Sequence, residues 1–231
     1  MLPLFSVYCP VPMKKTKNNR IVANGIVLSR RFEKALVYAV RIHGKQVRKR
    51  THRPYIGHLL SVASIVIEFD GDEDMAIAAL LHDAVEDQGG LPRLRDIRRR
   101  FGKRVAHIVD ECTDSYAMPK LPWIDRKRAY LERIPKEAAE VRLVSAADKL
   151  SNARETLQDV RAHGVEVFES FAGKKDGTLW YYQALVDKFR EAESSALVEE
   201  LARVVTELKQ LSTSRSLERN RNQKEKRRRA E

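Results

Sequence analysis

Acidic and imidazole side chains are spaced for metal chemistry in one short stretch, Leu80-Leu81-His82-Asp83-Ala84-Val85-Glu86-Asp87. At about 100° per helical residue, His82 and Glu86 lie about 40° apart, as do Asp83 and Asp87. The four side chains therefore share one arc of the predicted helix. Carboxylates near a helix C-terminus oppose the macrodipole, and a bound cation would offset that conflict. A solvated helix end is the alternative interpretation.

Two further polar side chains interrupt apolar segments elsewhere in the chain, His58 and Asp148. Burying either group without a partner costs several kcal/mol. The alternatives to ligation are a satisfied core histidine at His58, and a buried ion pair with Lys149 or Arg154 at Asp148. Combined with the first stretch, two His and two Asp form an N/O ligand set that suits Mn²⁺, Fe²⁺ or Zn²⁺. This set predicts a catalytic metal site, where the ion lowers the pKa of bound water.

The elements that must position these groups are all predicted to be helices. Apolar residues recur at steps of three and four, Ser29 is a candidate N-cap, and Pro54 suits a first turn. We find neither a hairpin turn between alternating residues nor an internal repeat in the sequence, so the expected fold class is all-α. The expected helices span residues 29–42, 54–67, 73–86, 94–101, 105–109, 123–133, 137–160, 178–191 and 195–212.

Charge divides the chain into a nearly neutral body and two basic ends. The net charge is +12, but residues 1–31 hold six Lys or Arg and no acid, and residues 214–231 hold eight against three Glu. Residues 214–231 carry few apolar residues, which favours a poorly ordered tail, and we expect the basic N-terminal end to be poorly ordered as well. We expect a basic extension at 1–28, one helical domain at 29–192, a helix packing on it at 193–213 and a disordered tail at 214–231.

Composition excludes several classes of protein. With 43% hydrophobic residues in 231, the chain can bury a core of its own. Its two cysteines provide neither a disulfide framework nor a Cys metal cluster, which is typical of a reducing compartment. We find no secretion signal and no apolar run of about 18 residues. The expected location is the cytoplasm, with no membrane partner.

Five blocks of sequence, in order, resemble the HD-domain metal-dependent phosphohydrolases. The resemblance is most specific to the hydrolase domain of RelA/SpoT alarmone enzymes and their stand-alone relatives, and it covers residues 30–190. The blocks are Pro54-Tyr55-Ile56 with His58; Ala79 to Asp83 with Glu86-Asp87; Phe101-Gly102 with Val105 and Ile108-Val109; Thr113-Asp114; and Ala147 to Leu150 with Asn152 and Arg154.

The resemblance implies a single-domain helical bundle over 29–192 that removes the 3′-pyrophosphate of guanosine tetra- and pentaphosphate. It assigns the metal ligands to His58, His82, Asp83 and Asp148. The ion it implies is Mn²⁺, with Fe²⁺, Zn²⁺ or Mg²⁺ as alternatives. It makes Glu86 and Asp87 the pair that orients or deprotonates the attacking water.

The same resemblance places several side chains against a nucleotide substrate. Basic residues before Pro54 would contact the base or the phosphates, and an asparagine would contact the sugar. An aromatic residue of the penultimate helix would pack against the nucleotide. The implied substrate-binding residues are Arg48, Lys49, Lys120, Asn152, Arg154, Lys175 and Tyr181, with Trp180 and Tyr182 as competitors for the aromatic position.

Two other functions stay open at this point. The turn Arg50-Thr51-His52-Arg53 is bulkier than its family counterpart, so an HD phosphohydrolase for another nucleotide or nucleotide cofactor is one alternative. A nucleic-acid-binding regulator acting through the basic tails is the other, and its binding would be sensitive to salt. Synthesis of alarmones is not expected, because about 40 residues after the resemblance are too few for a synthetase domain.

Overall fold

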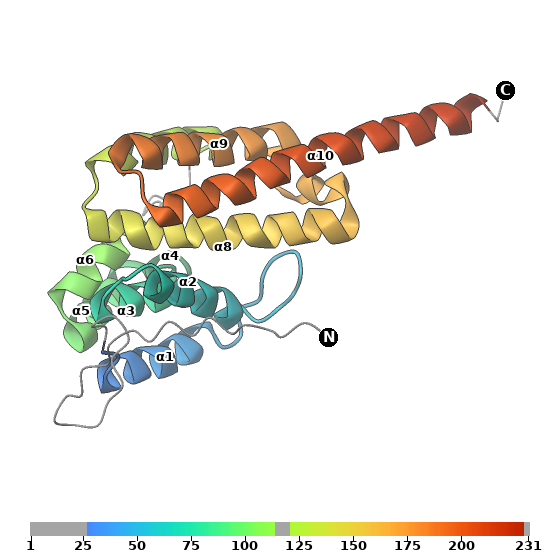
Figure 1. Cartoon of the computed structure of the whole chain (residues 1–231). Coiled ribbons are helices and arrows are strands. Elements are labelled where there is room, and N and C mark those ends of the chain that lie inside the picture. Colours follow the sequence, from blue (N-terminus) through green and yellow to red (C-terminus); the bar gives the residue numbers. More distant parts are fainter. Residues whose placement is uncertain (1–26, 114–120, 229–231) are drawn as a thin grey trace, which may run out of the picture.

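The chain folds into helices arranged in two layers (Figure 1). The computed structural model describes residues 27–113 and 121–228, with the part from 216 onward described as backbone only. Within these residues there is no strand beyond an isolated bridge between Val47 and Pro54. The predicted all-α fold class is confirmed. The helices are α1 (Arg30–His43), α2 (Ile56–Glu68), α3 (Glu73–Leu81), α4 (Ala84–Asp87), α5 (Gly90–Phe101), α6 (Lys103–Cys112), α7 (Trp123–Arg133), η1 (Ile134–Lys136), α8 (Ala139–His163), η2 (Val165–Ser170), α9 (Lys174–Ala192) and α10 (Ala196–Arg228).

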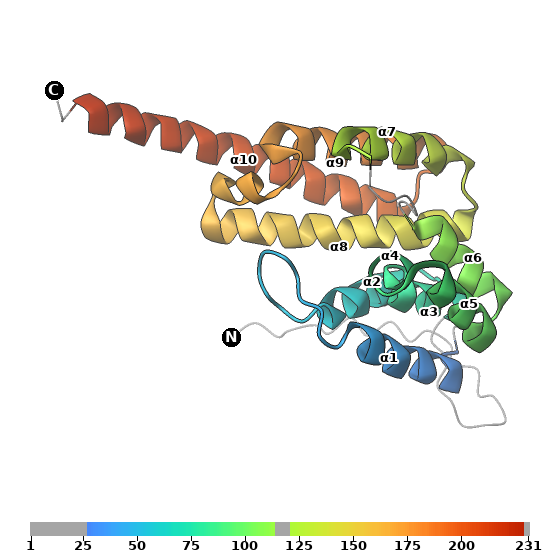
Figure 2. The same ribbon diagram turned by 180° about the vertical axis from the view of Figure 1, so that it is seen from behind.

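Helix α8 separates the two layers. The layer formed by α1 to α6 lies on one side of it, and α7, α9 and α10 lie on the other, as both ribbon views show (Figures 1 and 2). Helix α8 packs against α2 in the first layer and against α10 in the second. Because neighbours cover it on both sides, apolar residues occur nearly all round it, and Val144, Ala147 and Leu150 are fully buried. Polar residues on α8 therefore stand in the interior of the molecule.

The start of α1 follows the predicted capping chemistry. The Ser29 hydroxyl accepts a hydrogen bond from the Arg31 amide at 3.1 Å, which satisfies one of the first amides of the helix. The Ser29 amide in turn donates to the Glu73 carboxylate at 2.6 Å. This cap therefore also fixes α1 against the start of α3.

The predicted continuous helix over 73–86 is wrong, because the structure interrupts it at His82 and Asp83. Helix α3 ends at Leu81 and α4 begins at Ala84. The His82 ring binds the Ala79 carbonyl through Nδ1 at 2.8 Å, an acceptor that a continuous helix would offer to the Asp83 amide. The resulting turn gives His82 and Asp83 backbone positions that a regular helix would not give them.

The disordered tail expected at 214–231 is also wrong over most of its length. Helix α10 continues to Arg228, and its C-terminal part extends beyond the two layers (Figure 1). Residues 214–228 contain no Gly or Pro and are rich in Arg, Lys, Gln and Glu, which are good helix formers. The expected extension at 1–28 lies almost wholly outside the described residues. No helix in the described part of the chain is both long and apolar enough to cross a bilayer.

Candidate metal centre and active-site pocket

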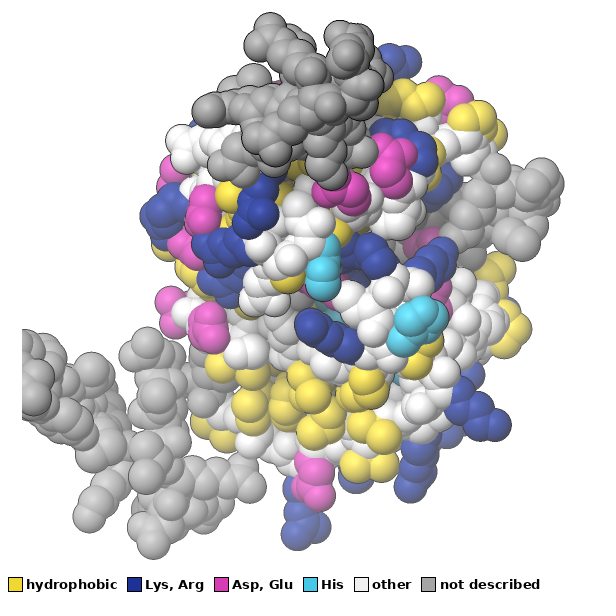
Figure 3. Space-filling model, turned by 90° about the vertical axis from the view of Figure 1, so that its right-hand side faces the viewer, with side chains coloured by type: hydrophobic (Ala, Val, Ile, Leu, Met, Phe, Trp, Pro, Cys, Tyr) yellow, Lys and Arg dark blue, Asp and Glu magenta, His cyan; other side chains and the backbone are white. Residues whose placement is uncertain are grey.

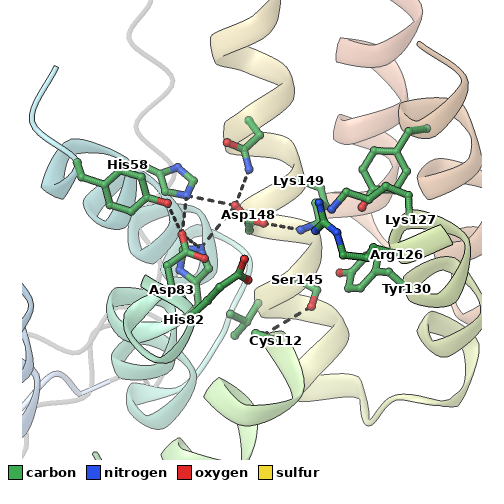
Figure 4. A pocket seen from close by; sticks show the side chains of 15 residues that line it. His58, His82, Asp83, Cys112, Arg126, Lys127, Tyr130, Ser145, Asp148 and Lys149 are labelled. Carbon is green, nitrogen blue, oxygen red and sulfur yellow. Dashed lines mark hydrogen bonds and ion pairs between the residues drawn. The ribbon is translucent and has the colours of Figure 1, made fainter. Parts of the chain in front are cut away.

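Three ligand-type side chains from different elements converge in the interior. His58 comes from α2, His82 from the turn after α3, and Asp148 from α8 (Figure 4). One ligand atom of each lies within 4.8 Å of the others, and all three residues are buried. Asp148 Oδ1 is 3.2 Å from His58 Nε2 and 3.6 Å from His82 Nε2. Segments up to 90 residues apart thus place two imidazoles and a carboxylate around one point.

Asp83 adds a second carboxylate to this group. Its Oδ2 lies 3.0 Å from His82 Nε2 and 3.8 Å from His58 Nε2. The Tyr55 hydroxyl donates a hydrogen bond to the same oxygen. The structure therefore brings together all four residues that the sequence suggested as ligands.

The imidazole rings are oriented by the nitrogens that face away from the cluster. His82 Nδ1 donates to the Ala79 carbonyl, which fixes its tautomer and leaves a lone pair on Nε2. His58 Nδ1 lies 3.3 Å from the Ser151 hydroxyl, which donates to Ser61. Both Nε2 atoms therefore face Asp83 and Asp148, as the ligand atoms of a metal site do.

This donor set fits a divalent cation. Among the residues that the structure describes, the buried His82 Nε2 finds no hydrogen bond of acceptable geometry. Burial disfavours an imidazolium, but the Asp83 and Asp148 carboxylates outweigh it and raise the pKa of His82 well above its usual value. The site thus favours positive charge between its imidazoles and carboxylates. Two nitrogens and two oxygens are a ligand set suited to Mn²⁺, Fe²⁺ or Zn²⁺.

The Asp148 carboxylate makes contacts on both of its oxygens. Lys149 Nζ lies 2.6 Å from Oδ2, and Asn152 Nδ2 donates to Oδ1 at 2.6 Å. The ion pair with Lys149 that stood as an alternative interpretation is therefore present, together with the contacts to the two His. Arg154 instead pairs with Glu200 of α10 at 3.1 Å.

The cluster opens into a cavity of about 220 Å³ with polar walls. The His and Asp side chains form one side, and Arg126 and Lys127 point in from α7 on the other, with Lys149 between them (Figure 4). Sequence reasoning missed Arg126 and Lys127 as site residues. Their only signal was a basic run in the predicted helix 123–133, which is also typical of a solvated face. The pocket thus places cations opposite the cluster of imidazoles and carboxylates.

The remaining predicted site residues divide into three groups. Glu86, Asn152 and Tyr181 line the cavity. A second group lies outside the lining: Asp87, Arg48, Lys49, Arg154 and Lys175. Lys120 lies outside the described residues. Of the competing aromatics, Tyr182 is buried beside the Thr156 hydroxyl at 3.2 Å, whereas Trp180 is 40% exposed.

Two further groups of the cavity stay uncharged at neutral pH. Burial raises the pKa of Cys112 to about 11 and that of Tyr130 to about 12. A nucleophilic thiol must be ionised, so Cys112 is unsuited to covalent catalysis. The chemistry of the pocket therefore belongs to its carboxylates, imidazoles and cations.

The basic loop at residues 44–55 packs on α8 instead of standing apart from the body. Arg48 pairs with Glu155, and Arg50 pairs with Asp159. Figure 3 shows an end of the molecule where Lys and Arg side chains are interspersed with Asp and Glu. Much of the positive charge that the loop carries is thus offset by acids on α8.

Comparisons with known proteins identify the family of the chain. The family model for the HD domain matches residues 35–179. The protein described as guanosine-3′,5′-bis(diphosphate) 3′-pyrophosphohydrolase MESH1 is 40% identical in Homo sapiens over 121 residues, covering 51% of this chain and 65% of that one. The Drosophila melanogaster protein of the same name is 36% identical over 130 residues, covering 55% and 70%.

A solved structure described as a metazoan ortholog of SpoT that hydrolyses ppGpp superposes with a TM-score of 0.63 at 29% identity. It covers 77% of this chain and 95% of its own. The chain spans about 65% of the length of the MESH1 proteins from Xenopus tropicalis and Homo sapiens. The family model matches a range of residues, 35–179, that spans most of the helical body and includes the cluster, and the chain therefore belongs to the HD-domain family.

Proposed function

We propose that the chain is a metal-dependent phosphohydrolase that removes the 3′-pyrophosphate of guanosine 3′,5′-bis(diphosphate), in the cytoplasm. The observation that carries this proposal is the convergence of His58, His82, Asp83 and Asp148 at the wall of a cavity with cations on its far side. The names of the MESH1 relatives support the choice of substrate. A diphosphate bound in this cavity would meet positive charge at both ends.

The four residues of the cluster would hold the ion, which we propose to be Mn²⁺. When bound, such an ion supplies Lewis acidity and lowers the pKa of water. The rings of His58 and His82 are already held by Ser151 and the Ala79 carbonyl, so their Nε2 atoms need little reorientation. Tyr55 holds Asp83 in the same way, and Asn152 holds Asp148.

We assign proton transfer to Glu86. It lines the cavity one helical turn after Asp83, and a carboxylate oxygen there can accept the proton of the attacking water. Water would add to the phosphorus attached to the ribose O3′, the P–O3′ bond would break, and O3′ would take up a proton, so that the products are pyrophosphate and GDP, or GTP where the substrate is the pentaphosphate. Lys127 and Arg126 would offset the charge on the phosphoryl oxygens, the largest contribution that proteins make to such transfers.

Metal analysis followed by an activity assay tests the proposal. Protein purified without chelator should contain about one divalent ion per chain and release pyrophosphate from guanosine tetraphosphate when Mn²⁺ is supplied. His82→Ala should lose metal and activity together. His107→Ala is the matched control, because His107 is exposed on α6. Pyrophosphate release by His82→Ala at the wild-type rate would reject the site.

A panel of substrates separates the alternatives left by the sequence. Phosphate release from other nucleotides or cofactors, with guanosine tetraphosphate left intact, would move the protein to another branch of the family. Binding of nucleic acid without any hydrolysis would favour a regulatory role instead. The polar cavity favours hydrolysis, because a pure binding module has no use for converging imidazoles and carboxylates.

A further inference from the structure

The basic loop 44–55 contacts the metal centre through a chain of side chains, and this inference rests on the proposed function. Four residues of α8 lie on one stripe facing that loop, namely Asp148, Asn152, Glu155 and Asp159. Their spacings of four, three and four place them on the same face of the helix. Arg50 pairs with the far end of the stripe at Asp159, and Arg48 with its middle.

Arg48 makes contacts that leave its guanidinium turned toward α8. Its Nη2 donates to Asn152 Oδ1 at 2.7 Å and pairs with Glu155. Its Cζ lies 5.5 Å from the centre of the Tyr55 ring. Only 19% of its side chain is exposed. The contacts of Arg48 are therefore with side chains next to the cluster, and its expected contact with a base or phosphate of the substrate stays a prediction.

These contacts determine how the Asn152 amide is turned. Arginine only donates hydrogen bonds, so the Asn152 oxygen must face Arg48. The Asn152 nitrogen then faces Asp148, an ionised carboxylate that only accepts. The amide cannot flip without breaking both bonds, which fixes Oδ1 of Asp148 toward the two imidazoles.

The Arg48 guanidinium also lies beside Tyr55, the residue that holds the second carboxylate, Asp83. Tyr55, whose ring lies beside Arg48, donates its hydroxyl proton to Asp83. Backbone hydrogen bonds hold the loop around Arg48, since its amide donates to Arg53 and its carbonyl accepts from His52, both at 2.9 Å. One partly buried arginine thus contacts the residues that hold both metal-site carboxylates.

We propose that Arg48, anchored by Glu155, is a positioning residue of the metal centre that fixes Asn152 and Tyr55 and through them Asp148 and Asp83. Residues that hydrogen-bond to metal ligands and hold them in place support metal binding. Their removal typically weakens the affinity for the metal ten- to a hundredfold. A residue that binds substrate instead changes KM and leaves the affinity for the ion alone. The two roles therefore differ in a measurement on the metal alone.

The test is a titration of metal-depleted protein with Mn²⁺, followed by electron paramagnetic resonance of the unbound ion. Arg48→Ala should weaken Mn²⁺ binding about ten- to a hundredfold, with KM for guanosine tetraphosphate at saturating Mn²⁺ changed less than about threefold. Arg53→Ala, an exposed arginine of the same loop, is the matched control and should bind Mn²⁺ as the wild type does. Unchanged Mn²⁺ affinity with a raised KM in Arg48→Ala would overturn the proposal.

Two more variants keep the test decisive if Arg48→Ala folds poorly. Arg48→Lys keeps the charge but loses the planar fork, so its Mn²⁺ affinity should fall between wild type and Arg48→Ala. Glu155→Gln should weaken Mn²⁺ binding in the same direction and add little to Arg48→Ala in the double variant, because both act through one contact. Fully additive effects would contradict the proposed anchor. Absence of Mn²⁺ binding by the wild type would reject the proposed function instead, so the two failures can be told apart.

Discussion

At the scale of single residues, the pocket separates the candidate metal ligands from a candidate proton acceptor. The imidazoles and the Asp83 and Asp148 carboxylates face one another, whereas Glu86 lines the cavity without belonging to the cluster of imidazole and carboxylate donors. Asp87, its neighbour, lies outside the lining, and Gln46 Nε2 donates to its Oδ2 at 2.7 Å. The two acids that the sequence treated as one pair therefore occupy different environments.

Replacing Glu86 should separate turnover from metal binding. Glu86→Gln keeps the volume of the side chain but cannot take a proton, so we expect kcat to fall about 10²- to 10⁴-fold. The Mn²⁺ content should stay at the wild-type value, because the ligand set is intact. Steady-state kinetics and metal analysis on the same preparation check both. A Glu86→Gln protein with near wild-type kcat would remove the proton-acceptor role from this residue.

The Cys112 thiol should be inert in the folded protein. With its pKa raised by burial to about 11, about one molecule in a thousand is ionised at pH 8. In a Cys9→Ser background, we expect alkylation by iodoacetamide to be slow, to rise about tenfold per pH unit below the pKa, and to become fast in denaturant. Rapid alkylation of the native protein at pH 8 would contradict the raised pKa of Cys112.

At the scale of elements, side-chain hydrogen bonds join α1 to α5. Asp96 of α5 accepts hydrogen bonds from Tyr38 of α1 and from Arg100, both at 2.7 Å. Arg93 donates to the Tyr38 hydroxyl at 2.8 Å and completes the link. This surface cluster ties α1 to α5 within the layer that carries His82.

Stability contributed by this link should depend on pH. Hydrogen bonding from Arg100 lowers the pKa of Asp96 from 3.8 to about 2, although slight burial opposes the shift. A lowered carboxyl pKa stabilises the fold above pH 3.8, and the contribution is lost as pH falls toward 2. Asp96→Asn should therefore cost about 0.5–1 kcal/mol at pH 7 and almost nothing at pH 2. Urea unfolding at both pH values measures the difference, and a cost independent of pH would contradict the assigned cause.

The helices also show which features of the fold can be predicted from the sequence and which cannot. Periodicity identified the helical segments, because each buries a face at spacings of three and four residues. It missed the break at His82, because a side-chain hydrogen bond to the Ala79 carbonyl leaves no periodic signal. It could not predict the contacts of Arg48 with Asn152 and Glu155, because these partners lie 104 and 107 residues away and depend on how the loop docks.

At the scale of the whole molecule, one long helix joins the two halves of the site. Helix α8 carries Asp148 toward the His residues of one layer and Lys149 toward α7 of the other. The type and order of the residues that form the cluster could be inferred from sequence alone. The cationic side of the pocket could not, because the contact between α7 and α8 is set by packing of the second layer.

The projecting end of α10 should be separable from the metal site. Deleting residues 216–231 removes helix beyond the two layers together with most of the positive charge of the C-terminal segment. We expect lower helicity at 222 nm, unchanged Mn²⁺ content and unchanged kcat. Any binding to nucleic acid should lose its salt dependence. Loss of metal from the truncated protein would show that this end of α10 supports the core.

The proposed activity depends most on a single ion held between the two layers. X-ray diffraction from crystals grown with Mn²⁺, recorded at an energy where manganese scatters anomalously, tests this directly. We predict one strong anomalous peak per chain, in contact with Nε2 of His58 and His82 and with carboxylate oxygens of Asp83 and Asp148. A fully occupied peak elsewhere, or none at this position at saturating Mn²⁺, would contradict the account.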